Sequence, residues 1–354
     1  MDRKILENDN KKLVERFGAA PLSKLKNIPK FYTFERKLIY SHRNFDSFFS
    51  ALKKGEKCAI VSGFNASGGI HIGHKPVFDT NLFFQKKYGI PVFIPISDDE
   101  SYVTGKVETQ EEALKNSIKL AKQLIAYGFN PKKTYFIIDQ VYTNIYNLAI
   151  KLSKKVNLSE IKSTYGYKNE ENIGLHFYPA IQSAHILFPQ EKYKIKNVLV
   201  PIGPDEDAHI RISRDIARRA GYKAPSILHS FFLPGTDGNK MSKSKNNAIF
   251  LEDDMATIKK KVNKAISGGR ETLEEHRKKG ADIDKDVPIY YLSKLFLTEK
   301  ESKKLIEGYK SGKIMTKEVK ERLYEELSKF IGDFQKRLKK VNMKTVDKCI
   351  LKNE

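Results

Sequence analysis

Residues 58–76 read CAIVSGFNASGGIHIGHKP, and this stretch decides the fold. Its first part, residues 58–64, is an apolar run that predicts a short buried strand. A glycine-rich loop follows, and residues 73–88 then have the pattern of a helix. A strand, a glycine-rich loop and a helix in this order predict a crossover unit whose helix N-terminus offers free N–H groups to a phosphate.

Strands and helices alternate outward from this unit. Further strands are predicted by the apolar runs at residues 91–97, 134–139, 196–202 and 226–232. Helices are predicted at residues 109–127, where Thr109 and Glu112 have the spacing of a capping box, and at residues 207–219. This alternation predicts an α/β fold with a doubly wound, parallel sheet.

The same pattern indicates how the chain divides. We expect an N-terminal appendage over residues 1–35, a Rossmann-like catalytic domain over residues 36–250 and a helical domain over residues 251–354. Residues 140–180 interrupt the alternation, and we interpret them as an insertion between the two halves of the sheet. After residue 251 only helical patterns follow, and the last of them, residues 317–338, is long and highly charged.

Composition limits the class of protein. The 354 residues include 65 Lys+Arg and 43 Asp+Glu, which gives a formal net charge of +22. Two cysteines, Cys58 and Cys349, cannot build a disulfide framework or a cysteine-rich zinc site. Because no apolar run approaches the roughly 20 residues of a spanning helix and no secretory leader is present, we expect a cytoplasmic protein without a membrane partner. The charge alone leaves open a nucleic-acid-binding surface or an ordinary lysine-rich solvent surface.

Two segments carry residues suited to nucleotide chemistry. His71 and His74, three residues apart after the first strand, can point at one phosphate group, with a surface turn as the alternative. Residues 235–247, GTDGNKMSKSKNN, form a flexible loop after the last strand, where Lys240 and Lys243 can neutralise polyphosphate charge. Both segments follow strands of one predicted sheet, so we expect them at its carboxyl edge, where doubly wound sheets bind ligands.

Together the two segments spell HIGH and KMSKS, and the chain resembles the class I aminoacyl-tRNA synthetases. Within that class it is similar to the tryptophanyl-tRNA synthetases of the archaeal and eukaryotic kind over residues 30–340. The segments that carry this likeness are YSHRNFD at residues 40–46, ISDDESY at 96–102, YPAIQSA at 178–184, GPDEDAHIRISRDIARR at 203–219 and SGGRETLEEHRKKGADIDKDV at 267–287. The last of these resembles a stretch that tyrosyl synthetases lack.

The resemblance implies roles for individual residues. The residues expected to be catalytic are His71, His74, Lys240 and Lys243. Those expected to bind ATP are Gly63, Gly73, Arg43, Gly203, Asp205, Met241, Ser242 and Ser244. Those expected to bind the amino acid are Glu100, Tyr178, Gln182, His185 and Glu206. Asp284 or Asp286 falls where the family reads the anticodon, and no protein side chain is expected to bind a metal.

One part of the family pattern is missing. The Tyr and Gln that read the indole N–H in eukaryotic members correspond to Val61 and Pro95, which have no side-chain acceptor. Bacterial members use an Asp at the position of His185, where a neutral imidazole can also accept the indole N–H. We therefore expect His185 to read the indole, with the Tyr178 hydroxyl as the next candidate. A histidine that only packs the helix is the alternative.

The implied function is a tryptophan–tRNA ligase that uses ATP with Mg²⁺. The tryptophan carboxylate attacks the α-phosphorus, pyrophosphate leaves, and the tryptophanyl group moves to tRNA(Trp); the resemblance also implies a homodimer. Three alternatives stay open: a tyrosine–tRNA ligase, a nucleotidyltransferase acting on a small molecule, and an inactive RNA-binding paralogue. Pyrophosphate exchange measured with tryptophan and with tyrosine would distinguish a tryptophan–tRNA ligase from a tyrosine–tRNA ligase. A nucleotidyltransferase would show no dependence on tRNA. The intact HIGH and KMSKS segments speak against the third.

Overall fold

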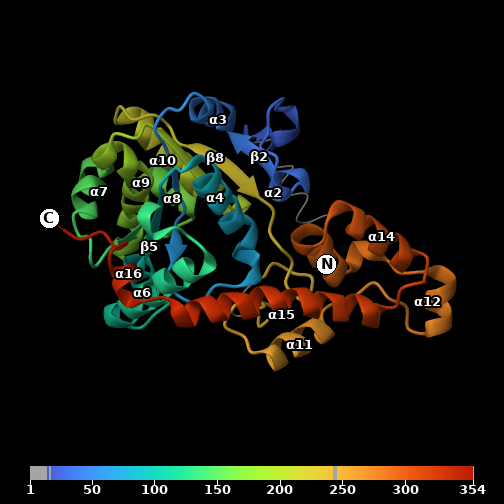
Figure 1. The fold of residues 1–354 in the computed structure, drawn as a ribbon. Helices are drawn as coiled ribbons and strands as arrows, with labels where there is room; N and C mark the ends of the chain where they lie inside the picture. Colours follow the sequence, from blue (N-terminus) through green and yellow to red (C-terminus); the bar gives the residue numbers. More distant parts are fainter. Residues whose placement is uncertain (1–13, 16, 242–244, 354) are drawn as a thin grey trace.

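The computed structural model describes residues 14–15, 17–241 and 245–353. An α/β unit lies over one half of a long helix, α15 (Thr316–Lys340), and shorter helices surround its other half (Figure 1). Within the described ranges, no helix is both long and apolar enough to cross a bilayer.

Five parallel strands form the centre of the sheet. Their spatial order is β8 (Ser226–Ser230), β7 (Asn197–Ile202), β3 (Cys58–Val61), β5 (Val92–Ser97) and β6 (Thr134–Ile138). A short strand, β4 (Phe64–Asn65), also pairs in parallel with β5. Because the chain order runs outward from β3 in both directions, the predicted doubly wound, parallel sheet is confirmed.

Helices cover both faces of the sheet because side chains alternate along each strand. On β3, Ile60 packs into the core beneath α3 (Phe45–Lys53), α4 (Lys75–Tyr88) and α6 (Gln110–Tyr127). Its neighbours Ala59 and Val61 face the opposite core, which α10 (Asp207–Arg219) covers together with the helices of the insertion. The start of α6 is capped as expected, since the Thr109 side chain accepts the N–H of Glu112. The side chain of Glu112, however, accepts from the N–H of Glu108 and not from that of Thr109.

The N-terminal edge of the sheet differs from the expectation. β2 (Ile39–Arg43) pairs antiparallel with β8, and β1 (Ala20–Pro21) pairs antiparallel with β2. Leu22 and Phe34 are buried in the core of the α/β unit. We expected an appendage over residues 1–35. From Ala20 onward this expectation is wrong, because the apolar side chains of this segment complete the core at this edge of the sheet.

The segment between β6 and β7 folds as three helices on one face of the sheet. They are α7 (Ile145–Ser153), α8 (Leu158–Tyr165) and α9 (Ile173–Tyr193). The insertion expected over residues 140–180 therefore ends later, since α9 passes through residue 180 without a break. Buried side chains of α7 and α9, such as Leu148 and Ala184, share a core with the strands.

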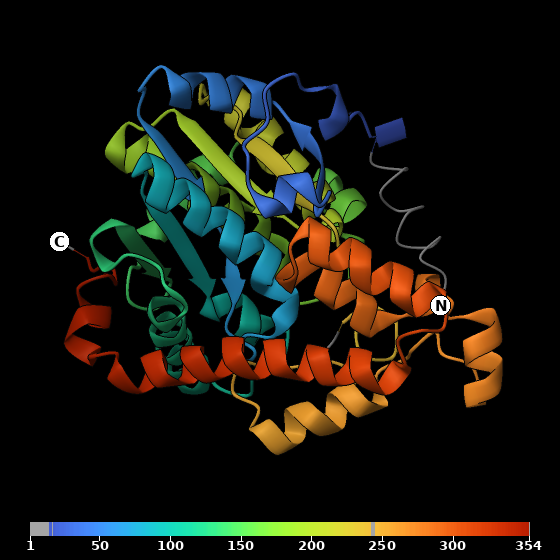
Figure 2. The ribbon, with the colours of Figure 1, turned by 45° about the vertical axis from the view of Figure 1, so that its right-hand side comes forward.

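The part of the chain beyond residue 251 is helical, as predicted. Its helices are α11 (Met255–Lys264), α12 (Leu273–Lys279), α13 (Val287–Tyr291), α14 (Glu299–Lys310), α15 and α16 (Met343–Asp347). Figure 2 shows α15 running beneath the α/β unit, and its buried residues belong to the same core as β3 and α6. The chain end then returns to the sheet, where Phe136 N donates to Cys349 O at 2.7 Å and Leu351 N donates to Phe136 O at 2.9 Å. The helical part and the α/β unit therefore share one continuous core.

Candidate active site

A cleft of about 390 Å³ opens at the carboxyl edge of the parallel strands. Its walls come from the ends of β3, β5 and β7, the turn before α4, one side of α9 and the loop after β8. Most residues expected at the site line it, namely His71, His74, Lys240, Met241, Gly63, Gly73, Gly203, Asp205, Glu100, Tyr178, Gln182, His185 and Glu206. The fold thus gathers in one cleft groups that are far apart in the sequence.

The HIGH segment forms a tight turn at the start of α4. His71 N donates to His74 Nδ1 at 3.1 Å, and the centroids of the two rings are 3.8 Å apart. A Cβ built on Gly73 would lie 2.8 Å from the His71 ring and 3.0 Å from Met241 Sδ. Any larger residue at this position would therefore have to push aside the His71 ring or the Met241 side chain.

The chain just after the KMSKS loop is joined to the HIGH segment by backbone hydrogen bonds. Ile72 N donates to Ile249 O at 2.9 Å, and Leu251 N donates to Ile70 O at 2.9 Å. At the front of the loop, Lys240 Nζ pairs with Asp205 Oδ2 at 2.8 Å, with both side chains about half exposed. Such an exposed pair is weak, so Lys240 is able to exchange Asp205 for an anionic ligand. The candidates Ser242, Lys243 and Ser244 lie outside the described residues.

The opposite wall of the cleft presents polar groups on α5 (Asp98–Val103) and α9. Glu100 accepts from Asn65 Nδ2 at 2.5 Å and from Lys106 Nζ at 3.0 Å. Gln182 Oε1 accepts from the Tyr165 hydroxyl at 2.7 Å and keeps a second lone pair for an ammonium donor, while its amide N–H groups can donate to a carboxylate. These groups suit the amine and carboxylate of an amino acid.

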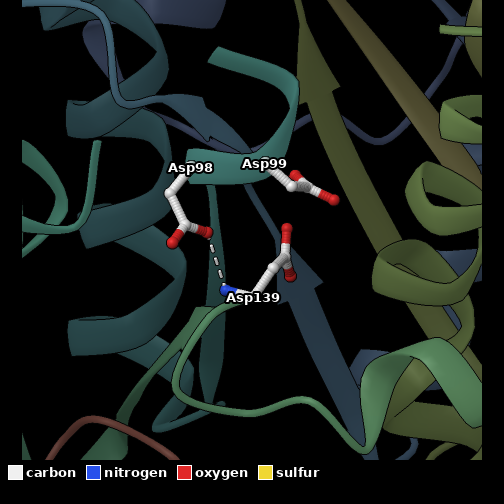
Figure 3. A group of neighbouring side chains, drawn as sticks. All are labelled: Asp98, Asp99 and Asp139. Atoms are coloured by element: carbon white, nitrogen blue, oxygen red, sulfur yellow. Dashed lines mark hydrogen bonds between the residues drawn. The ribbon is translucent and has the colours of Figure 1, made fainter. Parts of the chain in front are cut away.

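Behind this wall lies a cluster of three acids, of which two are buried and Asp99 is partly buried. Asp98, Asp99 and Asp139 come together from α5 and the end of β6, with Asp98 accepting from Asp139 N at 2.9 Å (Figure 3). The second oxygen of Asp98 accepts from Gln140 Nε2 at 2.7 Å, so Asp98 is already satisfied by protein donors. Burial and the neighbouring Asp139 raise the pKa of Asp99 to about 9. The cluster therefore suits a retained proton better than a metal ion.

His185 connects the cluster to the cleft. Its Nε2 lies 2.6 Å from Asp139 Oδ1, and both side chains are almost fully buried. Burial lowers the pKa of His185 to about 4, against the opposite effect of nearby carboxylates. The imidazole is therefore neutral at physiological pH, as an acceptor of an indole N–H must be.

Three predicted residues lie away from this cleft. Arg43 Nε and Nη2 donate to Asp207 at 2.8 and 2.9 Å, and Arg43 is not among the residues that line the cleft. Asp286 is 1% exposed and accepts from Gly268 N, Ile289 N and the Tyr309 hydroxyl. It caps a helix and is buried, so of the two predicted anticodon residues Asp284 is the one that the fold leaves accessible. Asp284 is exposed.

Sequence reasoning missed several residues of the site. Asn65 and Tyr165 orient Glu100 and Gln182, and Phe232 lines the cleft beneath Lys240, whose Nζ lies 4.4 Å from its ring centroid. Asp139 is separated from His185 by 46 residues. None of these belongs to a local motif, so the sequence held no signal that pairs them before the fold was known.

Comparisons with known proteins agree on one family. The family described as "tRNA synthetases class I (W and Y)" matches residues 53–332. The chain is 40% identical to the tryptophan–tRNA ligase of Methanocaldococcus jannaschii, covering 93% of this chain and 92% of that one. It is 34% identical to the tryptophan–tRNA ligase of Thermococcus onnurineus, covering 95% and 90%. Among solved structures, the tryptophanyl-tRNA synthetase of Aeropyrum pernix K1 superposes with a TM-score of 0.90 at 30% identity, covering 99% and 98% of the chains.

Proposed function

This chain belongs to the class I tRNA synthetases of the tryptophan and tyrosine type, and from that membership we propose that it joins L-tryptophan to tRNA(Trp) with ATP. The choice of tryptophan rests on relatives that are tryptophan–tRNA ligases and align with nearly the whole chain. The observation that carries the chemistry is the single cleft in which the HIGH turn, the front of the KMSKS loop and the polar side of α9 meet.

The first step is activation of the amino acid. The tryptophan carboxylate attacks the α-phosphorus of ATP, and pyrophosphate leaves to give tryptophanyl-adenylate. A carboxylate is already ionised at pH 7, so the step needs no side-chain base and no covalent enzyme intermediate. Catalysis is then in-line positioning together with stabilisation of charge on the phosphates.

The phosphate side of the cleft fits this task. The donors there are the imidazoles of His71 and His74, the ammonium of Lys240 and the N–H groups at the start of α4. We assign the ATP phosphates to these groups and the departing pyrophosphate to the loop that holds Lys240 and Lys243. When bound with ATP, Mg²⁺ supplies further neutralisation of the phosphate charge.

The amino-acid side would hold tryptophan. We assign its amine to Glu100 and Gln182, and its indole ring to the wall that includes His185 and Tyr178. Tyr178 is 7% exposed, and its hydroxyl already shares a hydrogen bond with Ser97 Oγ at 3.0 Å. This partner makes Tyr178 the weaker of the two candidates for the indole N–H.

Transfer to tRNA requires a surface for a polyanion. The net charge of +22 and the helical region beyond residue 251 support a tRNA-binding role for that region, with Asp284 as the candidate anticodon contact. We also propose a cytoplasmic homodimer, which the family resemblance supports.

Pyrophosphate exchange with each of the twenty amino acids tests the proposed function. We expect exchange that depends on tryptophan, and charging of tRNA(Trp) with the same amino acid. Exchange that responds to tyrosine and not to tryptophan would identify a tyrosine–tRNA ligase. Exchange that needs no amino acid would favour a nucleotidyltransferase.

A further inference from the structure

His185 occupies an unusual position between a buried acid and the cleft. It lies on α9 with only 2% of its surface exposed, and it lines the cleft. Asp139, at the end of β6, is 0% exposed and does not line the cleft. The contact at 2.6 Å between His185 Nε2 and Asp139 Oδ1 therefore lies on the protein side of the ring. Within the described part of the chain, the other nitrogen, Nδ1, makes no hydrogen bond.

The state of Asp139 depends on its neighbour Asp99. Asp139 Oδ2 is buried without a protein donor among the described residues, and in Figure 3 the carboxyl group of Asp139 points toward the side chain of Asp99. Burial raises the pKa of Asp99 to about 9 and also raises that of Asp139, so at neutral pH this pair keeps a proton. A proton between Asp99 and Asp139 Oδ2 satisfies that oxygen and leaves Oδ1 as an acceptor.

A carboxylate oxygen at 2.6 Å selects one tautomer of a neutral histidine. If the imidazole proton is on Nε2, it is donated to Asp139 Oδ1, and Nδ1 keeps its lone pair. We propose that Asp139 is a positioning residue that holds the His185 proton on Nε2, so that Nδ1 accepts the indole N–H of tryptophan. This inference rests on the proposed function, because it assumes that tryptophan is the amino acid bound.

The surroundings of His185 support the neutral form. The titratable groups that face it or the adjoining acids are Asp98, Asp99 and Glu100 on α5, Asp139 after β6, Tyr146 on α7 and Tyr178 on α9. No cation is among them, yet burial outweighs their attraction for a proton and keeps the pKa of His185 at about 4. The acceptor is therefore available at every pH above about 5.

A tryptophan isostere tests the proposal. In β-(3-benzothienyl)alanine a sulfur replaces the indole N–H and nearly keeps the ring shape, so it cannot donate to Nδ1. In pyrophosphate exchange, we expect the wild type to prefer tryptophan by about 10- to 100-fold in kcat/KM, the range for one lost hydrogen bond at a buried polar site. Asp139→Ala should reduce this preference to less than about threefold and raise the tryptophan KM, with the ATP KM within about twofold.

Two matched variants separate positioning from simple stability. Asp139→Asn keeps an amide oxygen that can accept from Nε2–H, so it should retain most of the preference for tryptophan. Asp98→Asn changes an acid of the same cluster that has no contact with His185, and it should keep the wild-type preference. The proposal is wrong if Asp139→Ala keeps the wild-type preference, or if Asp98→Asn loses it to the same extent.

A measurement on the wild type covers the case in which Asp139→Ala does not fold. In ¹⁵N-histidine-labelled protein, long-range proton–nitrogen spectra report which ring nitrogen carries the proton, and a His185→Gln sample assigns the signals. We expect the His185 proton on Nε2, and a shift of Nδ1 when tryptophan binds. A proton on Nδ1 overturns the proposal. Failure of the proposed function is distinct, because the wild type would then show no tryptophan-dependent exchange at all.

Discussion

The two sides of the cleft are built in different ways. On the phosphate side, the His71–His74 turn and the segment that follows β8 are each continuous in the sequence, and backbone hydrogen bonds from Ile72 to Ile249 and from Leu251 to Ile70 join them. On the amino-acid side, His185, Asp139 and Asp99 are brought together from separate elements and buried. The residues proposed to bind ATP thus belong to short sequence motifs. The residues proposed to select the amino acid are brought together only by tertiary packing. Substitutions on the two sides should therefore change different kinetic constants.

The largest effect is expected at Lys243. If it neutralises pyrophosphate only in the transition state, Lys243→Ala should lower kcat by about 10²–10³ and barely change the tryptophan KM, since one such contact is worth roughly 2.7–4 kcal/mol. Steady-state exchange kinetics measure both constants. If the kcat of the variant is within about threefold of the wild-type value, this loop has no role in catalysis.

A tenfold effect is expected at Gly73. A methyl group there would lie 2.8 Å from the His71 ring and 3.0 Å from Met241 Sδ, so Gly73→Ala must shift the His71 ring or the Met241 side chain. Overpacking of this kind costs about 1–3 kcal/mol, and we expect the ATP KM to rise about tenfold. Gly69→Ala is the control, because the nearest side chains to its methyl group, Glu252 and Phe250, would lie farther away, at 3.3 and 3.8 Å. Equal losses in the two variants would contradict the close-packing argument.

A smaller effect separates the two acids near the expected anticodon site. Asp284→Ala should raise the tRNA KM about fivefold, which corresponds to a loss of roughly 1 kcal/mol of binding free energy. It should not change pyrophosphate exchange. Asp286→Ala removes a buried helix cap instead, and it should lower the melting temperature, since such caps contribute about 0.5–2 kcal/mol. Charging assays and thermal melts together check both. Unchanged charging by Asp284→Ala would exclude Asp284 from tRNA recognition.

The last effect concerns stability, not kinetics, on the amino-acid side. The folded protein keeps a proton on Asp99 up to about pH 9, whereas the unfolded chain releases it near pH 4. Between these pH values the folded state binds more protons, so the free energy of unfolding falls as pH rises. Asp99→Asn mimics the protonated acid and should remove that fall. Thermal melts from pH 4.5 to 8.5 should show a gain over the wild type that grows with pH. A loss that is equal at every pH would show that Asp99 is not protonated when folded.

The difference between the two sides also explains what the sequence could predict. The strand–loop–helix unit around Gly73 and the helix at residues 207–219 were predicted because their apolar patterns are local. β1 and β2 were missed because only long-range pairing, of β2 with β8 and of β1 with β2, makes them strands. His185 was predicted through a family position, but its partner Asp139 was not, since 46 residues separate them and only the packing of α9 on the sheet joins them. Arg43 was assigned to ATP, and its ion pair with the buried Asp207 had no signal in the sequence.

The most direct test measures the ATP and tryptophan KM values in parallel for Gly73→Ala and His185→Ala. His185→Ala removes the proposed acceptor of the indole N–H, so its tryptophan KM should rise about tenfold while its ATP KM stays within about twofold. Gly73→Ala should show the reverse pattern. If both variants raise both KM values to the same extent, the two sides of the cleft do not act separately, and the account is contradicted.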